Sequence, residues 1–189
     1  QKAALSVPRE APLVGAVGRL SEQKNPLAFV RLAARVYEKM PDVHFVWIGD
    51  GPLESSALGL AVELGVEKVV HFVGQRSDVP ADLHALDVFA MTSRWEAFSL
   101  ALLEAMACGL PVVATRLAGI AEAVTEGENG FLLSVSDVDG MSAAMQKLLS
   151  DRELAKRMGV NARQRVEQNF TRPQMMDRLM QVYRSVINL

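Results

Sequence analysis

The clearest candidates for chemistry are two glutamates, Glu96 and Glu104, with seven residues between them. Across residues 97–109 Glu104 is the only ionisable side chain besides the thiol of Cys108, and the predicted helix around it is apolar on every side. Such a helix is expected to be buried all round. Because an unpaired carboxylate in apolar packing is costly, Glu104 should meet strong donors, either an internal Arg or Lys or ligand hydroxyls such as those of ribose.

The loop before this helix brings Glu96 to the same place as a set of free backbone groups. The helix is predicted to begin near Ser99, and its first N–H groups carry a partial positive charge that favours phosphate oxygens. Glu96 is expected to reach this crevice from the loop, and plain exposure to solvent is the alternative for a glutamate in a loop. The segment therefore predicts a site for a ligand that carries both hydroxyl and phosphate groups.

Five cationic side chains follow predicted strands and so fall at one edge of the expected sheet. In a doubly wound sheet the ligand crevice lies beyond the carboxyl ends of the strands. The chain as a whole carries a formal charge of −2, so this local bias indicates a pocket for a multiply charged anion such as a diphosphate. Taken singly, each cation would be a solvated surface charge. The five are Arg19, Lys24, Arg76, Arg94 and Arg116.

The sequence pattern predicts alternating strands and helices, and these elements must position the candidate residues. Six short apolar runs predict strands, and Pro26 is well placed as the first residue of the helix after the first run. The alternation implies right-handed crossovers and a buried parallel sheet. The usual order 3-2-1-4-5-6 would place Arg19 and Glu96 opposite one another at the switch point. The predicted strands are residues 13–17, 43–48, 69–73, 88–91, 112–114 and 131–133.

Helices alone follow the sixth strand, and the last of them is amphipathic. Four apolar side chains on one face of this helix predict packing against the core. We expect residues 1–189 to form a single α/β domain, a doubly wound parallel six-stranded sheet with carboxyl-terminal helices. The apolar face comprises Met175, Leu179, Val182 and Val186. The predicted helices are residues 141–149, 152–166 and 174–187.

Several segments resemble family 4 of the glycosyltransferases and occur in that family's order along the chain. The resemblance covers the chain from about residue 13 to its end, and it implies one half of a GT-B glycosyltransferase with a Rossmann-like sheet. The segments are GRLSEQKN at 18–25, GDG at 49–51, FVG at 72–74, Glu96 with Glu104, GLPVVAT at 109–115, Gly119, Glu122 and GENG at 127–130.

The resemblance implies a reaction and a role for each candidate residue. The reaction would be a retaining transfer of a hexose from a UDP-, GDP- or ADP-sugar to a glycan or lipid-linked acceptor, with no metal and no other cofactor. Cations and the helix start would stabilise the leaving diphosphate in place of a metal. The implied catalytic residues are Arg19 and Lys24, on the diphosphate, and Glu96, on the hexose. Gln75 and Arg76 would lie beside the base, Glu104 would bind the ribose, and Phe98, Ser99 and Leu100 would contribute backbone groups. Gly18 is a further implied substrate-binding residue.

The chain departs from the family pattern in places. Ala97 and Ser99 stand where the family often has glycine, and side chains there would narrow the approach of the sugar. The pair Ala118-Gly119 replaces a common double glycine, and Ala121 replaces a frequent proline.

The family also uses a preceding domain that supplies the acceptor site, and this domain is absent from the chain. We therefore expect the isolated chain to bind the donor weakly and to transfer nothing measurable. The full-length protein is expected in the cytoplasm, free or peripheral at the inner face of the membrane.

Two other functions remain open. A non-catalytic nucleotide-sugar sensor would keep the same donor residues, and a sucrose synthase-like or phosphorylase enzyme would share the fold. A nicotinamide-dependent oxidoreductase should carry Gly-x-Gly-x-x-Gly after the first strand, and an ATPase should carry a phosphate loop that ends in Gly-Lys-Ser or Gly-Lys-Thr. The chain has neither motif.

Composition argues against further classes. The balance of 20 basic and 22 acidic residues offers no basic surface for nucleic acid, and no apolar stretch approaches the roughly 18 residues of a membrane span. Asp137 and Asp139 have the spacing of a metal-binding pair, but they precede a predicted helix and are expected to cap it. The three histidines have no ligand spacing and are expected to be structural.

Overall fold

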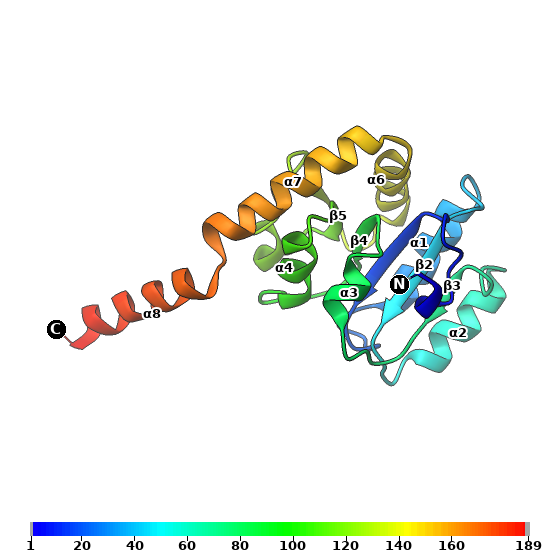
Figure 1. The fold of residues 1–189 in the computed structure, drawn as a ribbon. Helices are drawn as coiled ribbons and strands as arrows, with labels where there is room; N and C mark the ends of the chain where they lie inside the picture. Colours follow the sequence, from blue (N-terminus) through cyan, green and yellow to red (C-terminus); the bar gives the residue numbers. More distant parts are fainter. Residues whose placement is uncertain (1, 188–189) are drawn as a thin grey trace.

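The strands pair in parallel in the order β3-β2-β1-β4-β5-β6, as the alternating sequence pattern predicts (Figure 1). The computed structural model describes residues 2–187. Every strand boundary falls within one residue of its prediction. The strands are β1 (Leu13–Val17), β2 (His44–Ile48), β3 (Val70–Phe72), β4 (Val88–Met91), β5 (Val112–Thr115) and β6 (Gly130–Leu133).

Helices cover both faces of this sheet, and the sheet divides the hydrophobic core into two parts. Successive strand residues face opposite sides, so Val14 packs with α1, α2 and α6 while Leu13 packs with α3, α4 and α5. Phe29 of α1 lies edge-on to Trp47 of β2, with ring centroids 5.2 Å apart. The helices are η1 (Lys2–Leu5), α1 (Pro26–Tyr37), α2 (Glu54–Glu63), α3 (Val79–Leu83), α4 (Leu100–Ala107), α5 (Ala118–Ala121), α6 (Val138–Ser150), α7 (Arg152–Asn169) and α8 (Arg172–Ile187).

The predicted starts of α1 and α4 are confirmed. Pro26 is the first residue of α1. The side chain of Ser99 accepts a hydrogen bond from the backbone N–H of Leu102 and so caps α4. Asp137 caps α6 by accepting from the N–H of Gly140 at 2.8 Å, which is the structural role expected for it. Because α6 begins at Val138, three residues before its predicted start, Asp139 lies in the first turn and is not a cap.

The last helix contradicts its prediction. In Figure 1 α8 projects away from the sheet, and it has no buried residue. Met175, Leu179, Val182 and Val186 are between 41% and 64% exposed, so the expectation that they pack in this core is wrong. Amphipathicity predicts that a helix face can be buried, but it does not specify the surface that covers it. Among the described residues no helix has the length and apolar character needed to cross a bilayer.

A close backbone contact fixes the loop that carries Glu96. A Cβ atom placed on Gly119, in α5, would lie 1.8 Å from the carbonyl oxygen of Ala97. No side chain fits there without a shift of one backbone segment. Gly119 therefore allows α5 to approach the loop between β4 and α4.

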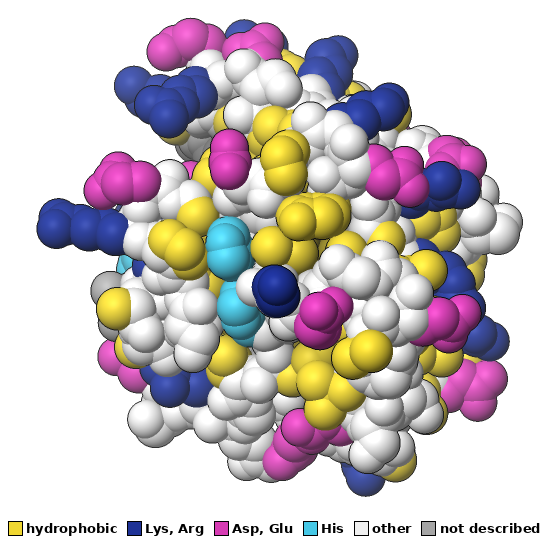
Figure 2. Space-filling model, turned by 90° about the vertical axis from the view of Figure 1, so that its right-hand side faces the viewer, with side chains coloured by type: hydrophobic (Ala, Val, Ile, Leu, Met, Phe, Trp, Pro, Cys, Tyr) yellow, Lys and Arg dark blue, Asp and Glu magenta, His cyan; other side chains and the backbone are white. Residues whose placement is uncertain are grey.

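Two histidines form a pair at the opposite end of β2 and β3. His44 Nδ1 and His71 Nε2 lie 2.9 Å apart, and the two rings are within 7° of parallel. Figure 2 shows two histidine side chains side by side on one face of the molecule. Burial lowers the pKa of His44, against the raising effect of Asp42. Burial and the neighbouring His44 lower the pKa of His71.

We predict that the substitution Gly119→Ala lowers the free energy of unfolding by about 1–3 kcal/mol, because the new methyl group overpacks against a backbone carbonyl. The matched control is Gly59→Ala in α2, where a Cβ meets nothing within 4 Å. That change should raise stability by about 0.5–1 kcal/mol, through a smaller loss of backbone entropy. Urea denaturation measures both, and equal effects of the two substitutions would contradict the contact.

We also predict that the histidine pair makes stability depend on pH. Because both pKa values are lowered on folding, the folded state binds fewer protons than the unfolded chain. The contribution of the pair to the free energy of unfolding is thus fully present above about pH 6.5, the usual histidine pKa, and it is lost as the pH falls below that value. The melting temperature of the wild type should therefore drop more than that of His71→Gln between pH 7.5 and about pH 5.5. His84→Gln, at an exposed position, should retain the wild-type dependence.

Candidate functional site

The loops after β1 and β4 meet at the switch point of the sheet. The N–H of Arg94 donates to the carbonyl oxygen of Gln23 at 2.7 Å, and Gln23 Nε2 donates to the carbonyl oxygen of Trp95 at 3.2 Å. These bonds join two segments about 70 residues apart in the chain. The predicted convergence of these two loops is confirmed.

Glu96 lies inside this junction and is not a solvated loop residue. Its side chain is only 5% exposed. Lys24 Nζ lies 2.5 Å from Glu96 Oε1, and Ser93 Oγ donates to the same oxygen at 2.9 Å. The residue that meets Glu96 across the switch point is thus Lys24, whereas the strand order had suggested Arg19. Lys24 lies further along the loop after β1 than Arg19 does, and this part of the loop returns to the end of β4.

Arg19 lies further out, beside the end of β2. Arg19, Gly49, Asp50 and Gln75 line an open hollow of about 390 Å³. Gln75 Nε2 donates to Asp50 Oδ1 at 3.2 Å. The structure therefore brings Arg19 and Gln75 together, and it adds Asp50, which sequence reasoning missed because the search at this edge was for cations.

The backbone of Gly18 is anchored by β2. The indole N–H of Trp47 donates to the carbonyl oxygen of Gly18 at 2.8 Å, and the N–H of Gly18 donates to Ile48 at 3.0 Å. A Cβ on Gly49 would lie 2.3 Å from that same carbonyl oxygen. The loop that carries Arg19 and Lys24 is thus held close to the sheet edge.

Three of the five cations at this edge have acidic partners. Arg76 makes two hydrogen bonds to the buried carboxylate of Asp82, at 3.0 and 3.2 Å, and these bonds raise the pKa of Arg76. Arg116 pairs with Glu126 at 2.8 Å, and Arg94 lies 3.4 Å from Glu22. Acidic partners thus engage three of the five: Asp82 in α3, and Glu22 and Glu126 in loops. Arg19 makes no ion pair with the described residues.

The helix α4 is not buried all round. Its buried face consists of Leu102, Ala105 and Met106, whereas Leu100 is 73% exposed and Glu104 is exposed. The expectation of a buried Glu104 is therefore wrong. The Leu and Ala residues around Glu104 suggested burial on every side, whereas Glu104 itself marks the exposed face of α4. The Glu104 carboxylate makes no hydrogen bond or ion pair within the described residues, so it is free to meet a ligand.

The start of α4 presents Phe98, Ser99 and Leu100. Ser99 is 3% exposed because its hydroxyl serves as the helix cap, and Phe98 lies with its ring 5.6 Å from that of Phe170. Within the described residues the N–H of Leu100 makes no hydrogen bond. The amino end of α4 can thus still donate to an anion, although Ser99 already engages one of its N–H groups.

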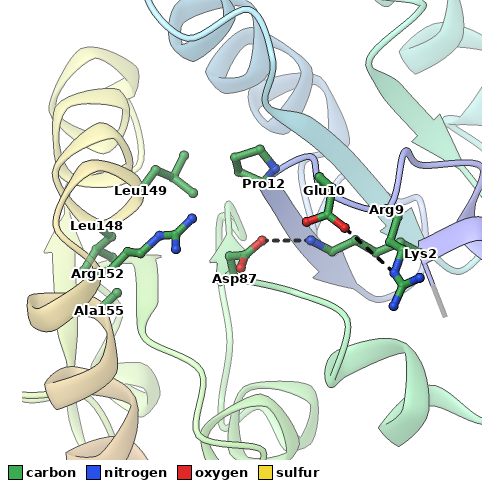
Figure 3. Close-up of a pocket in the computed structure, with 9 residues that line it drawn as sticks. All are labelled: Lys2, Arg9, Glu10, Pro12, Asp87, Leu148, Leu149, Arg152 and Ala155. Atoms are coloured by element: carbon green, nitrogen blue, oxygen red, sulfur yellow. Dashed lines mark hydrogen bonds and ion pairs between the residues drawn. The ribbon is translucent and has the colours of Figure 1, made fainter.

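Another hollow, of about 410 Å³, lies at the opposite edge of the sheet (Figure 3). Two of its cations face carboxylates: Lys2 lies 3.4 Å from Asp87, and Arg9 lies 3.8 Å from Glu10. Arg152 also lines the hollow and makes no ion pair with the described residues. Asp87 also accepts from the N–H of Leu13 at 2.8 Å, so it anchors the start of β1. None of the predicted site residues lines this hollow.

Comparisons with known proteins bear on this geometry. Residues 1–165 match the sequence model of the family described as Glycosyl transferases group 1. A lipopolysaccharide core biosynthesis glycosyltransferase of Rhizobium meliloti is 32% identical over 184 residues, which are 97% of this chain and 53% of that relative. The chain spans about half the length of this curated relative.

Solved structures agree on the fold. The Anabaena protein HepE in complex with UDP-glucose superposes with a TM-score of 0.83 at 28% identity, over 95% of this chain and half of that one. The carboxyl-terminal domain of a Francisella tularensis group 1 family glycosyl transferase superposes with a TM-score of 0.81 at 25% identity, over 90% of this chain and 93% of that one. The expected GT-B fold is thereby confirmed. The chain belongs to the group 1 family of glycosyltransferases.

Proposed function

We propose that this domain binds the sugar donor in a retaining hexosyltransferase. The enzyme takes a hexose from a nucleoside-diphosphate sugar and passes it to a glycan or lipid-linked acceptor, without a metal ion. The acceptor site belongs to a preceding domain of the full-length protein, which works in the cytoplasm or at the inner face of the membrane.

The observation that carries this proposal is the Lys24–Glu96 pair at the switch point. A lysine and a glutamate held there, with Arg19 nearby, provide cationic groups for phosphate and a carboxylate for sugar hydroxyls. The Lys24 ammonium has three donors, so it can bond a phosphate oxygen while it keeps Glu96. This location also matches the crevice in which doubly wound sheets bind ligands.

The chemical work is the stabilisation of a leaving diphosphate. When the glycosidic bond to the diphosphate breaks, negative charge develops on its oxygens. Arg19, Lys24 and the N–H groups at the start of α4 are placed in advance to stabilise that charge, which lowers the barrier. Glu96 orients the hexose, and the exposed Glu104 carboxylate accepts hydrogen bonds from the ribose hydroxyls.

A UDP-sugar is the first donor to test. The Anabaena relative, 28% identical to this chain, was crystallised with UDP-glucose. Ala97 is exposed beside Glu96, whereas the Ser99 side chain is buried as the cap of α4, so of the two departures only Ala97 can narrow the approach of the hexose.

The test is a transfer assay with the full-length protein that carries this domain, with UDP-glucose and a glycan or lipid-linked acceptor. The α-linked donor should give an α-linked product by NMR, and the rate should not change with EDTA. Arg19→Ala should slow transfer by about 10²- to 10³-fold, because one group that stabilises the diphosphate is lost.

Arg94→Ala is the matched control, since this exposed arginine pairs only with Glu22 among the described residues. It should leave the rate within about twofold of the wild type. An inverted product, inhibition by EDTA or equal losses in both variants would refute the proposal. A full-length protein that binds UDP-glucose but never releases UDP would be a non-catalytic sensor instead.

A further inference from the structure

A buried threonine hydroxyl extends the contact between β4 and β5 beyond their last paired residues. The ladder between these strands ends at Met91 and Ala114. Just beyond it, Thr115 Oγ1 donates to the carbonyl oxygen of Ser93 at 2.7 Å. Thr115 is 0% exposed and Ser93 is 1% exposed. A side-chain hydrogen bond thus holds the backbone of β4 where strand pairing has stopped.

A second hydroxyl does the same on the β1 side. Thr92 Oγ1 lies 3.1 Å from the carbonyl oxygens of Lys24 and Asn25. Asn25 has a left-handed backbone conformation with φ of 54°, which is uncommon for a residue other than glycine. The loop that carries Lys24 is therefore tied to the end of β4 as well.

Both attachments lead to one carboxylate oxygen. Thr115 holds the backbone of Ser93, and the Ser93 hydroxyl donates to Glu96 Oε1. Lys24, whose backbone Thr92 holds, donates to the same oxygen. The other oxygen, Oε2, accepts no hydrogen bond from the described residues and keeps contact with solvent. The protein thus engages one oxygen of Glu96 and leaves the other for a ligand.

We propose that Thr115 is a positioning residue that, through Ser93, holds Glu96 so that Oε2 faces a hydroxyl of the transferred sugar. This rests on the proposed function, because the sugar is the ligand that Glu96 meets. Thr115 touches no substrate itself. A buried threonine with a purely structural role would instead affect the whole domain, and the two cases differ in what they do to nucleotide and sugar separately.

Calorimetric titration of the full-length protein with UDP and with UDP-glucose distinguishes a positioning role of Thr115 from a purely structural one. Thr115→Val keeps the shape and removes the hydroxyl. It should weaken binding of UDP-glucose about tenfold while binding of UDP stays within about twofold, since only the sugar contact depends on Glu96. Thr115→Ser restores the hydroxyl and should restore UDP-glucose binding. Thr125→Val, at an exposed position, is the control and should change neither.

Equal losses for UDP and UDP-glucose, or no loss for either, would overturn the positioning role. If Thr115→Val does not fold, Ser93→Ala removes the next link and should cause the same selective loss. If the wild type binds neither UDP nor UDP-glucose, the proposed use of this donor fails. A crystal structure of Thr115→Val then decides the positioning role, because a displaced Glu96 supports it and an unmoved Glu96 contradicts it.

Discussion

The adjacency of β1 and β4 is the constraint on which the site depends. From these neighbouring parallel strands the chain continues to opposite halves of the sheet, so their carboxyl ends form the switch point at which doubly wound sheets have their ligand crevice. Hydrogen bonds join the two loops that follow these strands. Lys24 and Glu96 come together across this crevice although 72 positions separate them in the chain. With side chains only 19% and 5% exposed, they are better shielded from water than a surface ion pair, and removal of either would leave a poorly solvated charge.

Around this pair the sheet edge is built mostly from small residues and backbone contacts. Gly49 and Gly119 let neighbouring segments approach where a Cβ atom would collide with a carbonyl oxygen. The indole of Trp47 and the hydroxyls of Thr92 and Thr115 then bond the backbone of the loops. These contacts hold the charged groups in place without a ligand, as the proposed stabilisation of a leaving diphosphate requires.

The fold could be predicted almost completely from the sequence, and the site only in part. Apolar runs and helix caps depend on local chemistry, so the strand boundaries and the starts of α1 and α4 follow from nearby residues. The pairing of Arg76 with Asp82 and the exposure of Glu104 depend on tertiary contacts that no local pattern reports. The same holds for α8, whose apolar face lies uncovered by the described residues. Ser93 could have been found, because a hydroxyl three residues before a loop glutamate is a natural partner for it.

The central claim is that a nucleotide sugar binds at the switch point between β1 and β4. Titration of the isotopically labelled domain with UDP-glucose, followed by two-dimensional NMR, tests this claim directly and detects weak binding as well. The account predicts that the largest shifts occur at residues 18–24, at Gln75 and at residues 96–104. Shifts centred on Lys2, Asp87 and Arg152, at the opposite hollow of Figure 3, would contradict it.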